Sequence, residues 1–289
     1  MFATRATEGG MHRETLTAAG EALAAAGVGS PWREARRLVE LAAQEPWSAV
    51  HASGHLPRWA RGRLRRLVAA RASGVPTVLL SGRTGFLDFE LRVAPGVFVP
   101  RPETEELAER AAEVLRALSG PPRVLDLGCG SGALAVAVAR ARPDARVVAV
   151  DLSPRARRCA RDNARALGVA DRVEVRRSDW YSAVTGKFHL IVSNPPYVPR
   201  NELDGLPPEI RCYEPRLALD GGARGLQAVY RILAQAPAHL LPGGWIMLEI
   251  DHRQGRDVQQ FAHHQGYLIE TSVERDLAGK ERFFVGRCR

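Results

Sequence analysis

The stretch RVLDLGCGSGALAVAVA, residues 123–139, decides the fold class of this chain. Residues 123–127 are mainly apolar and have the length of a buried strand, and the alanine-rich segment after the glycines predicts a helix. Glycines at positions 128, 130 and 132 let the backbone approach a ligand closely, and the N-terminus of the following helix favours an anionic group. The stretch therefore predicts a strand, a ligand-binding turn and a helix.

Strand and helix patterns continue to alternate after this unit. The further strands are expected at 146–151, 172–179, 188–193, 244–250, 267–275 and 281–287. The further helices are expected at 153–168, at 226–240 with an interruption at Pro237, and at 253–265. Such alternation is typical of a Rossmann-like α/β fold, a parallel sheet with helices on both faces.

The remainder of the chain divides into parts with different patterns. Residues 1–75 predict a small helical bundle, because their apolar residues recur at helical spacing. Residues 76–100 alternate and turn as a β-hairpin linker would. Residues 101–289 begin with a helix at 101–120 and contain the predicted sheet. We therefore expect a helical N-terminal domain that docks substrate, a hairpin linker and a larger catalytic domain.

Composition excludes several classes of protein. The chain has 289 residues, 45% of them hydrophobic and 25% charged, which is typical of a globular protein. Its four cysteines are scattered without a C-x-x-C pair and no H-E-x-x-H occurs, so neither a disulfide framework nor a metal site is expected. No apolar segment approaches a membrane span and no signal peptide is recognisable, so the expected location is cytoplasmic. The protein could start at Met11, after a ten-residue extension.

The charge of the chain is strongly basic, with a formal net charge of +9 and a pI near 10.1. Residues 58–71 place Arg58, Arg61 and Arg65 on one side of a predicted helix. This helix either docks an acidic protein surface or RNA, or is a solvated face of the bundle. The overall basicity is equally compatible with an arginine bias that has no binding role.

The glycine turn also fits the loose dinucleotide fingerprint, but Asp126 argues against a pyrophosphate. A carboxylate two residues before the first glycine would repel phosphate, whereas it suits the cationic end of S-adenosylmethionine. Two alternatives for the glycine turn stay open. It could only pack the strand on the helix, or it could bind a nicotinamide or flavin cofactor. The expected cofactor is S-adenosylmethionine, and the residues expected to bind it here are Asp126, Gly128, Cys129, Gly130, Ser131 and Gly132.

Residues at the ends of the next two strands extend this predicted site. Asp151 ends the second strand, where a carboxylate can accept both ribose hydroxyls, although it could instead cap the following helix. Asp179 and Trp180 end the third strand, where the edge and face of adenine would lie. Packing of a loop tryptophan on the core is the other interpretation of Trp180.

The stretch SNPPYVP, residues 193–199, follows the fourth strand and carries the predicted chemistry. Pro195 and Pro196 stiffen the backbone and remove two N–H donors, so Asn194 Oδ1 and a proline carbonyl form a pair of acceptors. Such a pair suits a planar –NH₂ group, and Tyr197 offers it an aromatic face. We expect these four residues to be catalytic, by orientation rather than by a strong base, with Asn194 also bordering the cofactor. A loop that only ends a strand is the alternative, and the motif does not separate glutamine from adenine.

In their order along the chain, LDLGCGSGALAVAVA, AVDLSP, SDWYSA and VSNPPYVP resemble the Rossmann-type N-methyltransferases. GVFVPRPETEEL (96–107), YEPRLALDGG (213–222), LLPGGWIMLEI (240–250) and ERDLAGKERFFVGR (274–287) resemble the HemK or PrmC family of peptide chain release factor glutamine N5-methyltransferases. That resemblance covers nearly the whole chain and implies the same three-part architecture. It also implies class I release factors as partners, modified at the glutamine of their Gly-Gly-Gln loop.

The resemblance implies further roles and shows two departures. It places Arg101, Glu103 and Thr104 near the mouth of the site, where a structural linker role is equally possible. The family usually has Gly-Gly-x-Asp-Gly-Leu where this chain has Arg224, and Glu-Ile-Gly where this chain has Asp251. Neither position belongs to the cofactor loop. The alternatives that stay open are an N6-adenine methyltransferase of RNA or DNA, a methyltransferase of another protein's glutamine, such as a ribosomal one, and an inactive cofactor-binding module.

Overall fold

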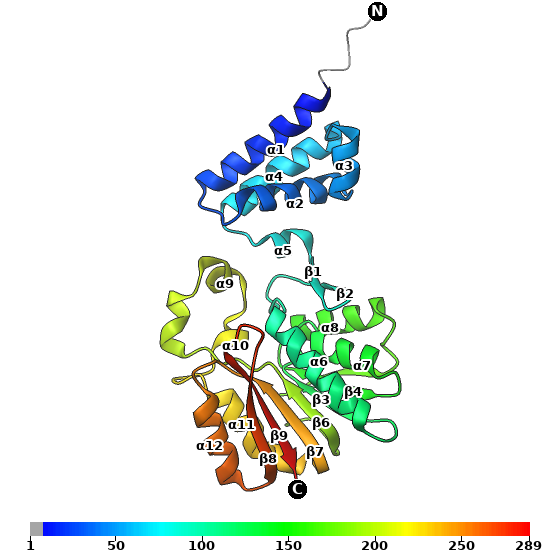
Figure 1. The fold of residues 1–289 in the computed structure, drawn as a ribbon, viewed down its shortest axis with the longest axis vertical. Helices are drawn as coiled ribbons and strands as arrows, with labels where there is room; N and C mark the ends of the chain where they lie inside the picture. The colour runs from blue at the N-terminus through cyan, green and yellow to red at the C-terminus, as the bar shows by residue number, and fades with distance from the viewer. Residues whose placement is uncertain (1–7) are drawn as a thin grey trace, which may run out of the picture. The chain divides into compact units, whose positions relative to one another are not determined.

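The computed structural model describes residues 8–289, and the chain divides after Gly82 into two compact units (Figure 1). The expected extension before Met11 lies mostly outside the described residues, and its residues 8–10 belong to the first helix. No helix among the described residues combines the length and the apolar character that crossing a membrane requires.

The first unit is a bundle of helices. These are α1 (Glu8–Ala25), α2 (Pro31–Ala43), α3 (Trp47–Ser53), α4 (Arg58–Ala72) and α5 (Thr77–Ser81). Its core contains Leu23, Leu38 and Leu64, which come from the apolar faces of α1, α2 and α4. The basic helix is α4, and its Arg58 and Arg65 are exposed. Arg71 of the same helix is instead buried and pairs with Glu34 at 3.1 Å, so this arginine stabilises the bundle.

A seven-stranded sheet forms the centre of the second unit, in the order β5-β4-β3-β6-β7-β9-β8. Its strands are β3 (Arg123–Leu127), β4 (Arg146–Asp151), β5 (Val173–Arg177), β6 (Phe188–Ser193), β7 (Leu240–Glu249), β8 (Leu268–Arg275) and β9 (Glu281–Cys288). The pairs among β3 to β7 are parallel, as expected, but β9 is antiparallel to both β7 and β8. The sheet is therefore mixed, because the short turn between β8 and β9 allows only a hairpin.

Helices cover both faces of this sheet, as the alternation predicted (Figure 1). One apolar cluster joins the sheet to α6 (Pro102–Ala117), α7 (Ala133–Ala141) and α8 (Pro154–Ala166). A second cluster joins the other face to α11 (Gln227–Gln235) and α12 (Gly255–Gln265). Successive strand residues face opposite clusters: Val124 belongs to the first, and Leu125 to the second. Burial on both faces explains why the strands are apolar almost throughout.

Three segments differ from the sequence-based expectation. The hairpin β1 (Arg83–Phe86) and β2 (Phe89–Arg92) is shorter than 76–100, because α5 takes the first part of that range. Its Phe86 packs in the first cluster of the sheet, so the hairpin belongs to the second unit. The helix expected at 226–240 ends at Gln235, and the 3₁₀ turn η2 (Ala236–Ala238) contains Pro237. Strand β7 consequently starts at Leu240 rather than at 244.

Between β6 and α11 the chain forms short helices that the sequence did not predict. They are η1 (Arg200–Gly205), α9 (Pro208–Tyr213) and α10 (Arg216–Leu219). Prolines 199, 207, 208 and 215 precede or begin these helices, and the helices η1 and α9 end shortly before Pro207 and Pro215. These short helices lie over the carboxyl ends of the strands and become part of the site described below.

Asn163 of α8 is a buried amide, 1% exposed, that ties the hairpin to the glycine turn. Its Oδ1 accepts the Arg92 N–H at 2.8 Å, and its Nδ2 donates to the carbonyls of Arg92 and Ser131, both at 2.9 Å. One side chain thereby satisfies three backbone groups from β2 and from the turn after β3. Buried backbone groups are costly when unpaired, so this contact fixes the turn's position.

We expect Asn163→Ala to lower the free energy of unfolding by about 3 kcal/mol, because it leaves buried backbone groups without partners. Urea denaturation of the full chain measures the loss. Asp162→Asn is the matched control on the same helix; it alters only an exposed pair with Arg165 and should cost less than about 0.5 kcal/mol. A loss below about 1 kcal/mol in Asn163→Ala would contradict this role of the amide.

Candidate active site

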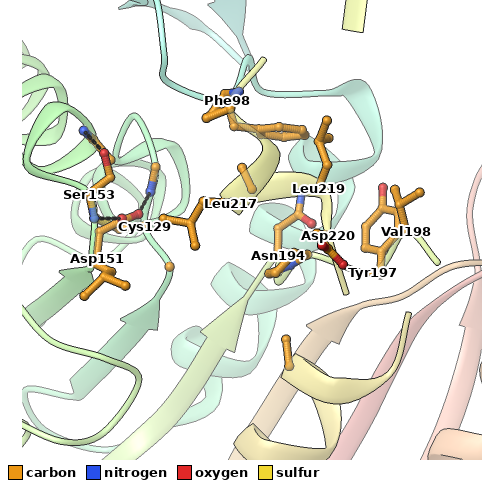
Figure 2. Close-up of a pocket in the computed structure, with 18 of the residues that line it drawn as sticks. Phe98, Cys129, Asp151, Ser153, Asn194, Tyr197, Val198, Leu217, Leu219 and Asp220 are labelled. Atoms are coloured by element: carbon orange, nitrogen blue, oxygen red, sulfur yellow. Dashed lines mark hydrogen bonds between the residues drawn. The ribbon is translucent and has the colours of Figure 1, made fainter. Parts of the chain in front are cut away.

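A cavity of about 780 Å³ lies beyond the carboxyl ends of β3, β4 and β6. Its wall contains residues 128–131 of the glycine turn, Asp151, residues 178–180, Asn194 and residues 196–198, together with the short helices after β6. Figure 2 shows Asp151 and Ser153 on one side of this cavity and Asn194 with Tyr197 on the other. The sheet therefore brings together the two motifs that the sequence analysis identified separately.

The glycine turn is held against the neighbouring strand by its backbone. The N–H groups of Gly128 and Cys129 both donate to the carbonyl of Val150, at 2.8 and 2.9 Å. Gly128, Gly130 and Gly132 have φ values of +70°, +55° and +84°, in the left-handed region that glycine adopts without strain. Cys129 and Ser131 line the cavity with the first two glycines.

Gly132 has a different place from the other members of the turn. It does not line the cavity, and a Cβ atom on it would lie 3.0 Å from Cβ of Ala160. This glycine therefore lets the start of α7 pack closely on α8. Gly132 therefore contacts α8 on the side of the turn away from the cavity, whereas Gly128 and Gly130 line the cavity.

Asp151 connects the turn to the end of β4. Its Oδ2 accepts the Gly130 N–H at 2.9 Å, and its Oδ1 accepts the Ser153 N–H at 2.8 Å. Ser153 caps α8 by accepting the Ala156 N–H at 3.3 Å. Burial raises the pKa of Asp151, and the two backbone donors oppose that rise. Each carboxylate oxygen keeps a lone pair, so the group can accept two hydroxyls while it holds the turn.

Asp126 lines the same cavity and is 1% exposed. Its Oδ2 accepts the Ala135 N–H at 3.2 Å, whereas its buried Oδ1 has no hydrogen-bond partner among the described residues. Burial raises the pKa of this carboxyl group to about 7, although the Ala135 N–H opposes the rise. An unpaired buried acceptor is costly, and a donor from a bound ligand would satisfy it. The residues present therefore fit the cationic end of S-adenosylmethionine.

The structure places Asp179 and Trp180 beside the turn. The Asp179 carboxylate pairs with both terminal nitrogens of Arg231 on α11, at 3.0 and 2.9 Å, and lines the cavity. Trp180 has a left-handed φ of +53°, and its ring passes 3.7 Å from the position that a Gly128 Cβ would occupy. Its ring also packs against the second apolar cluster, which is the alternative interpretation of this residue, and Trp180 lines the cavity as well.

Asn194 lies at the end of a buried hydrogen-bond chain. Its Nδ2 donates to Thr104 Oγ1 at 2.9 Å, and that hydroxyl donates to Glu249 Oε2 at 2.8 Å. Tyr197 donates its hydroxyl to the other oxygen, Glu249 Oε1, at 3.1 Å. Burial raises the pKa of Glu249 to about 7 and holds that of Tyr197 well above its usual range. Asn194 and Tyr197 are thus both anchored on one carboxylate.

Sequence reasoning did not identify Glu249 as a site residue. Residues 240–250, which include Glu249, are interpreted from the sequence only as part of a strand and as a stretch that resembles the family. The available signal was a carboxylate at the carboxyl end of an otherwise apolar strand, the same signal that identified Asp151. Of the residues expected near the mouth, Arg101 and Thr104 line the cavity, and Glu103 does not.

The backbone of the Asn-Pro-Pro-Tyr stretch is clamped by the loop that follows α10. The space for a Cβ atom on Gly221 is taken by the Pro196 carbonyl oxygen, 2.7 Å away, and that on Gly225 by the Tyr197 carbonyl. Gln254 also donates to the Tyr197 carbonyl, at 3.0 Å. Pro196 lines the cavity with Asn194 and Tyr197, whereas Pro195 is buried behind it.

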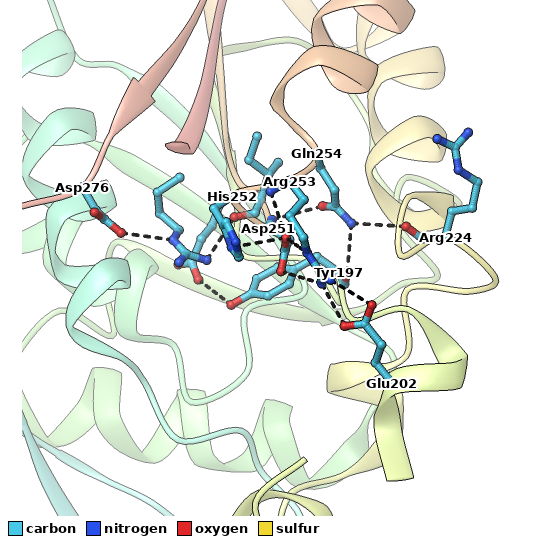
Figure 3. A network of polar contacts seen from close by, with 11 residues as sticks. Tyr197, Glu202, Arg224, Asp251, His252, Arg253, Gln254 and Asp276 are labelled. Atoms are coloured by element: carbon cyan, nitrogen blue, oxygen red, sulfur yellow. Dashed lines mark hydrogen bonds and ion pairs between the residues drawn. The ribbon is translucent and has the colours of Figure 1, made fainter. Parts of the chain in front are cut away.

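Both departures from the expected family pattern take part in ion pairs, and Figure 3 shows those of Asp251. Asp251 Oδ1 accepts both the backbone N–H and the Nε–H of Arg253, and Arg253 pairs in turn with Glu202 of η1 at 2.8 Å. Asp251 and Arg253 line the cavity. Arg224 lies away from the cavity lining and pairs with Asp257 of α12. Asp251 therefore links the end of β7 to η1 through Arg253, whereas the Arg224 side chain forms its ion pair at the surface.

Among residues 8–289, no group of three or more His, Cys, Asp or Glu side chains is arranged to hold a metal ion. Three of the residues that line the cavity offer it acceptor oxygens. The carboxylates of Asp126 and Asp151 are held by backbone N–H groups, and the Asn194 side chain is held by the hydrogen bond that its –NH₂ group donates to Thr104. Such an arrangement binds and orients donor groups such as hydroxyls, ammonium groups and –NH₂ groups.

Comparison with known proteins agrees with this arrangement. The family model of the methyltransferase small domain matches residues 89–205. A methyltransferase from Pyrococcus furiosus shares the fold, with a TM-score of 0.51 and 18% identity, over 78% of this chain and 98% of that one. The release factor glutamine methyltransferase of Cereibacter sphaeroides is 43% identical over 95% of this chain and 97% of its own length. That of Moorella thermoacetica is 40% identical over 96% and 98%.

These matches extend over almost the full length of both chains, so they span the hairpin, the glycine turn, the Asn-Pro-Pro-Tyr stretch and the later strands of this chain. The chain belongs to the release factor glutamine methyltransferase family.

Proposed function

We propose that this protein transfers a methyl group from S-adenosylmethionine to the side-chain amide nitrogen, N5, of a glutamine in class I peptide chain release factors. The names of its relatives support the release factor as substrate. The glutamine expected is that of the Gly-Gly-Gln loop. Acceptor groups in the cavity support a planar –NH₂ group as the site of methylation.

The orientation of the Asn194 carboxamide is the observation that carries this proposal. Its nitrogen is engaged by Thr104, and its oxygen accepts no hydrogen bond from the described residues. Asn194 lines the cavity together with Pro196 and Tyr197 (Figure 2). The free oxygen is thus an acceptor for one hydrogen of an incoming –NH₂ group, with the Tyr197 ring beside it to cover the planar amide.

The other side of the cavity supports the cofactor assignment. When bound, S-adenosylmethionine supplies an electrophilic methyl group. Asp151 is expected to accept the ribose hydroxyls, Asp126 Oδ1 to accept a donor from the cationic end, and Trp180 with Asp179 to border the adenine. The N–H groups at the start of α7 favour its carboxylate.

The chain's own contribution to the chemistry is orientation. An amide nitrogen is a weak nucleophile because its lone pair is delocalised, so its approach must be aligned and shielded from water. Asn194 Oδ1 holds one hydrogen of the amide, and this bond strengthens as positive charge grows on nitrogen. Leu217 and Leu219 of α10, with Phe98, supply apolar walls to the cavity.

N6-methylation of adenine is the second candidate, because the same acceptors suit an exocyclic amino group and the chain is basic. A second cavity, of about 640 Å³, is lined by arginines 123, 146, 161, 165, 172 and 176. It lies at the amino ends of β3 and β4, the edge of the sheet opposite to Asn194. Arg146 and Arg161 donate there to backbone carbonyls, which is a structural use of their charge.

We expect the purified protein with labelled S-adenosylmethionine to methylate a class I release factor and to leave RNA unlabelled. Mass spectrometry of the tryptic peptides should place one methyl group on the Gly-Gly-Gln glutamine. The control substrate is the release factor with that glutamine replaced by asparagine, which shortens the side chain by one methylene. Labelled RNA and an unlabelled release factor would establish the adenine alternative. Cofactor binding without any labelled product would establish the inactive module.

Asn194→Ala should lower kcat about 100-fold, because it removes the acceptor for the transferred nitrogen. The dissociation constant of S-adenosylhomocysteine, measured by titration calorimetry, should change less than about threefold, since the turn and Asp151 stay intact. A matching loss of cofactor affinity would instead make Asn194 a cofactor residue.

Asp151→Ala should show the converse behaviour. It removes an acceptor for the ribose hydroxyls and releases the Gly130 N–H, so the affinity for S-adenosylhomocysteine should fall about 10- to 100-fold. Asp162→Ala, an acidic side chain outside the cavity lining, is the control with unchanged affinity. Unchanged affinity in Asp151→Ala itself would contradict the ribose assignment.

A further inference from the structure

We propose that Glu249 is a positioning residue that determines, through Thr104, which end of the Asn194 carboxamide faces the substrate. The inference rests on the proposed function in one respect, namely that Asn194 Oδ1 receives the –NH₂ group to be methylated. Its structural part, the direction of the hydrogen-bond chain, stands on the contacts of the three side chains.

The direction of the hydrogen bonds from Asn194 through Thr104 to Glu249 follows from the number of hydrogens that each side chain can donate. An ionised carboxylate has no hydrogen to donate, so Glu249 can only accept. Thr104 has a single hydroxyl hydrogen and donates it to Glu249 Oε2 at 2.8 Å. Its oxygen can therefore only accept from Asn194, and the Asn194 group at 2.9 Å must be the –NH₂ end. The carboxamide oxygen is consequently the end that remains for the cavity.

Burial prevents water from replacing the hydrogen bonds that join Asn194, Thr104 and Glu249, which together are called the relay below. Glu249 is 1% exposed and Thr104 is 4% exposed, so water has little access to either group. The three residues come from the end of β7, the first turn of α6 and the segment after β6, and packing brings them together. The second oxygen of Glu249 accepts the Tyr197 hydroxyl at 3.1 Å. One carboxylate thus orients both the acceptor amide and the aromatic ring beside it.

The charges around Glu249 affect whether it is ionised. Burial raises its pKa to about 7, the Thr104 and Tyr197 hydroxyls and Arg282 oppose the rise, and Glu103 adds to it. Arg282 is itself held by Asp276 and by the Ile250 carbonyl. Ionisation, which the relay requires, therefore prevails as the pH rises above 7.

A glutamine at position 249 would have a hydrogen to donate. The relay could then run in the opposite direction, with Thr104 donating to the Asn194 oxygen and the Asn194 –NH₂ group turned into the cavity. The Asn194 –NH₂ group would then face the hydrogens of the substrate –NH₂ group, and two donors cannot form a hydrogen bond with each other. Thr104→Val would remove the relay altogether while it preserves the volume of the side chain.

The test combines Glu249→Gln, Thr104→Val and Thr104→Ser in methyl transfer to the release factor. We expect the first two to lower kcat about 10- to 100-fold with less than about a twofold change in the S-adenosylhomocysteine dissociation constant. Thr104→Ser keeps the hydroxyl and should restore most of the turnover lost in Thr104→Val. Equal losses in the serine and valine variants would show a packing role and overturn the proposal.

A double-mutant cycle separates positioning from other effects. If Thr104 acts only through Asn194, Thr104→Val should have no further effect on kcat in the Asn194→Ala background. Additive losses would overturn the proposal. Should Glu249→Gln fail to fold, the three Thr104 measurements still decide between the outcomes.

A readout without substrate distinguishes failure of this inference from failure of the proposed function. In NMR spectra of the ¹⁵N-labelled protein, the Asn194 side-chain –NH₂ hydrogens should show a nuclear Overhauser effect to the Thr104 methyl group. Glu249→Gln should abolish it as the amide turns over. If this nuclear Overhauser effect is present in the wild type and unchanged in Glu249→Gln, the relay is overturned, even if the release factor is methylated. Its presence with no methylation of the release factor would instead reject the proposed substrate alone.

Discussion

The site depends on the order of four parallel strands, β4-β3-β6-β7, because their carboxyl ends lie next to one another at one edge of the sheet. Each of these strands ends in or next to a polar side chain: Asp151, Asp126, Asn194 and Glu249, respectively. The chain changes direction across the sheet between β3 and β6, so the connections on the two sides leave a crevice there. The proposed cofactor side and the proposed substrate side of the cavity lie on the two sides of this crevice.

Burying carboxylates at this edge is costly, and the three carboxylates are satisfied by hydrogen bonds to different extents. Asp151 accepts two backbone N–H groups and so fixes the glycine turn. Glu249 accepts two hydroxyls and so fixes the substrate side. Asp126 has one oxygen satisfied and one unpaired. Asp126, whose hydrogen bonding is incomplete, lies where a donor of the ligand is expected. Asp151 and Glu249, whose oxygens all have partners, hold neighbouring residues in place.

Close backbone contacts give the substrate side its rigidity. Gly221 and Gly225 have no Cβ, and only this lets their loop pack against the carbonyls of Pro196 and Tyr197. Asp251 and Arg253 connect the same region to η1 through Glu202. These ion pairs attach η1 to the residues that follow β7, and the backbone of Val198 holds the end of α10 by accepting the Gly221 N–H and donating to the Leu219 carbonyl.

Local patterns in the sequence predicted the α/β alternation, the glycine turn and the Asn-Pro-Pro-Tyr stretch, because periodicity, glycine spacing and paired prolines are local properties of the chain. They also indicated Asp151, and the family resemblance indicated Thr104. The antiparallel direction of β9, the packing of Gly132 on Ala160 and the anchoring of Asn194 by Glu249 instead follow from tertiary contacts. Asn194 and Thr104 are 90 residues apart, and Thr104 and Glu249 are 145 apart. A hydrogen-bond chain between such residues depends on how α6 packs on the sheet, and no local pattern in the sequence encodes that contact.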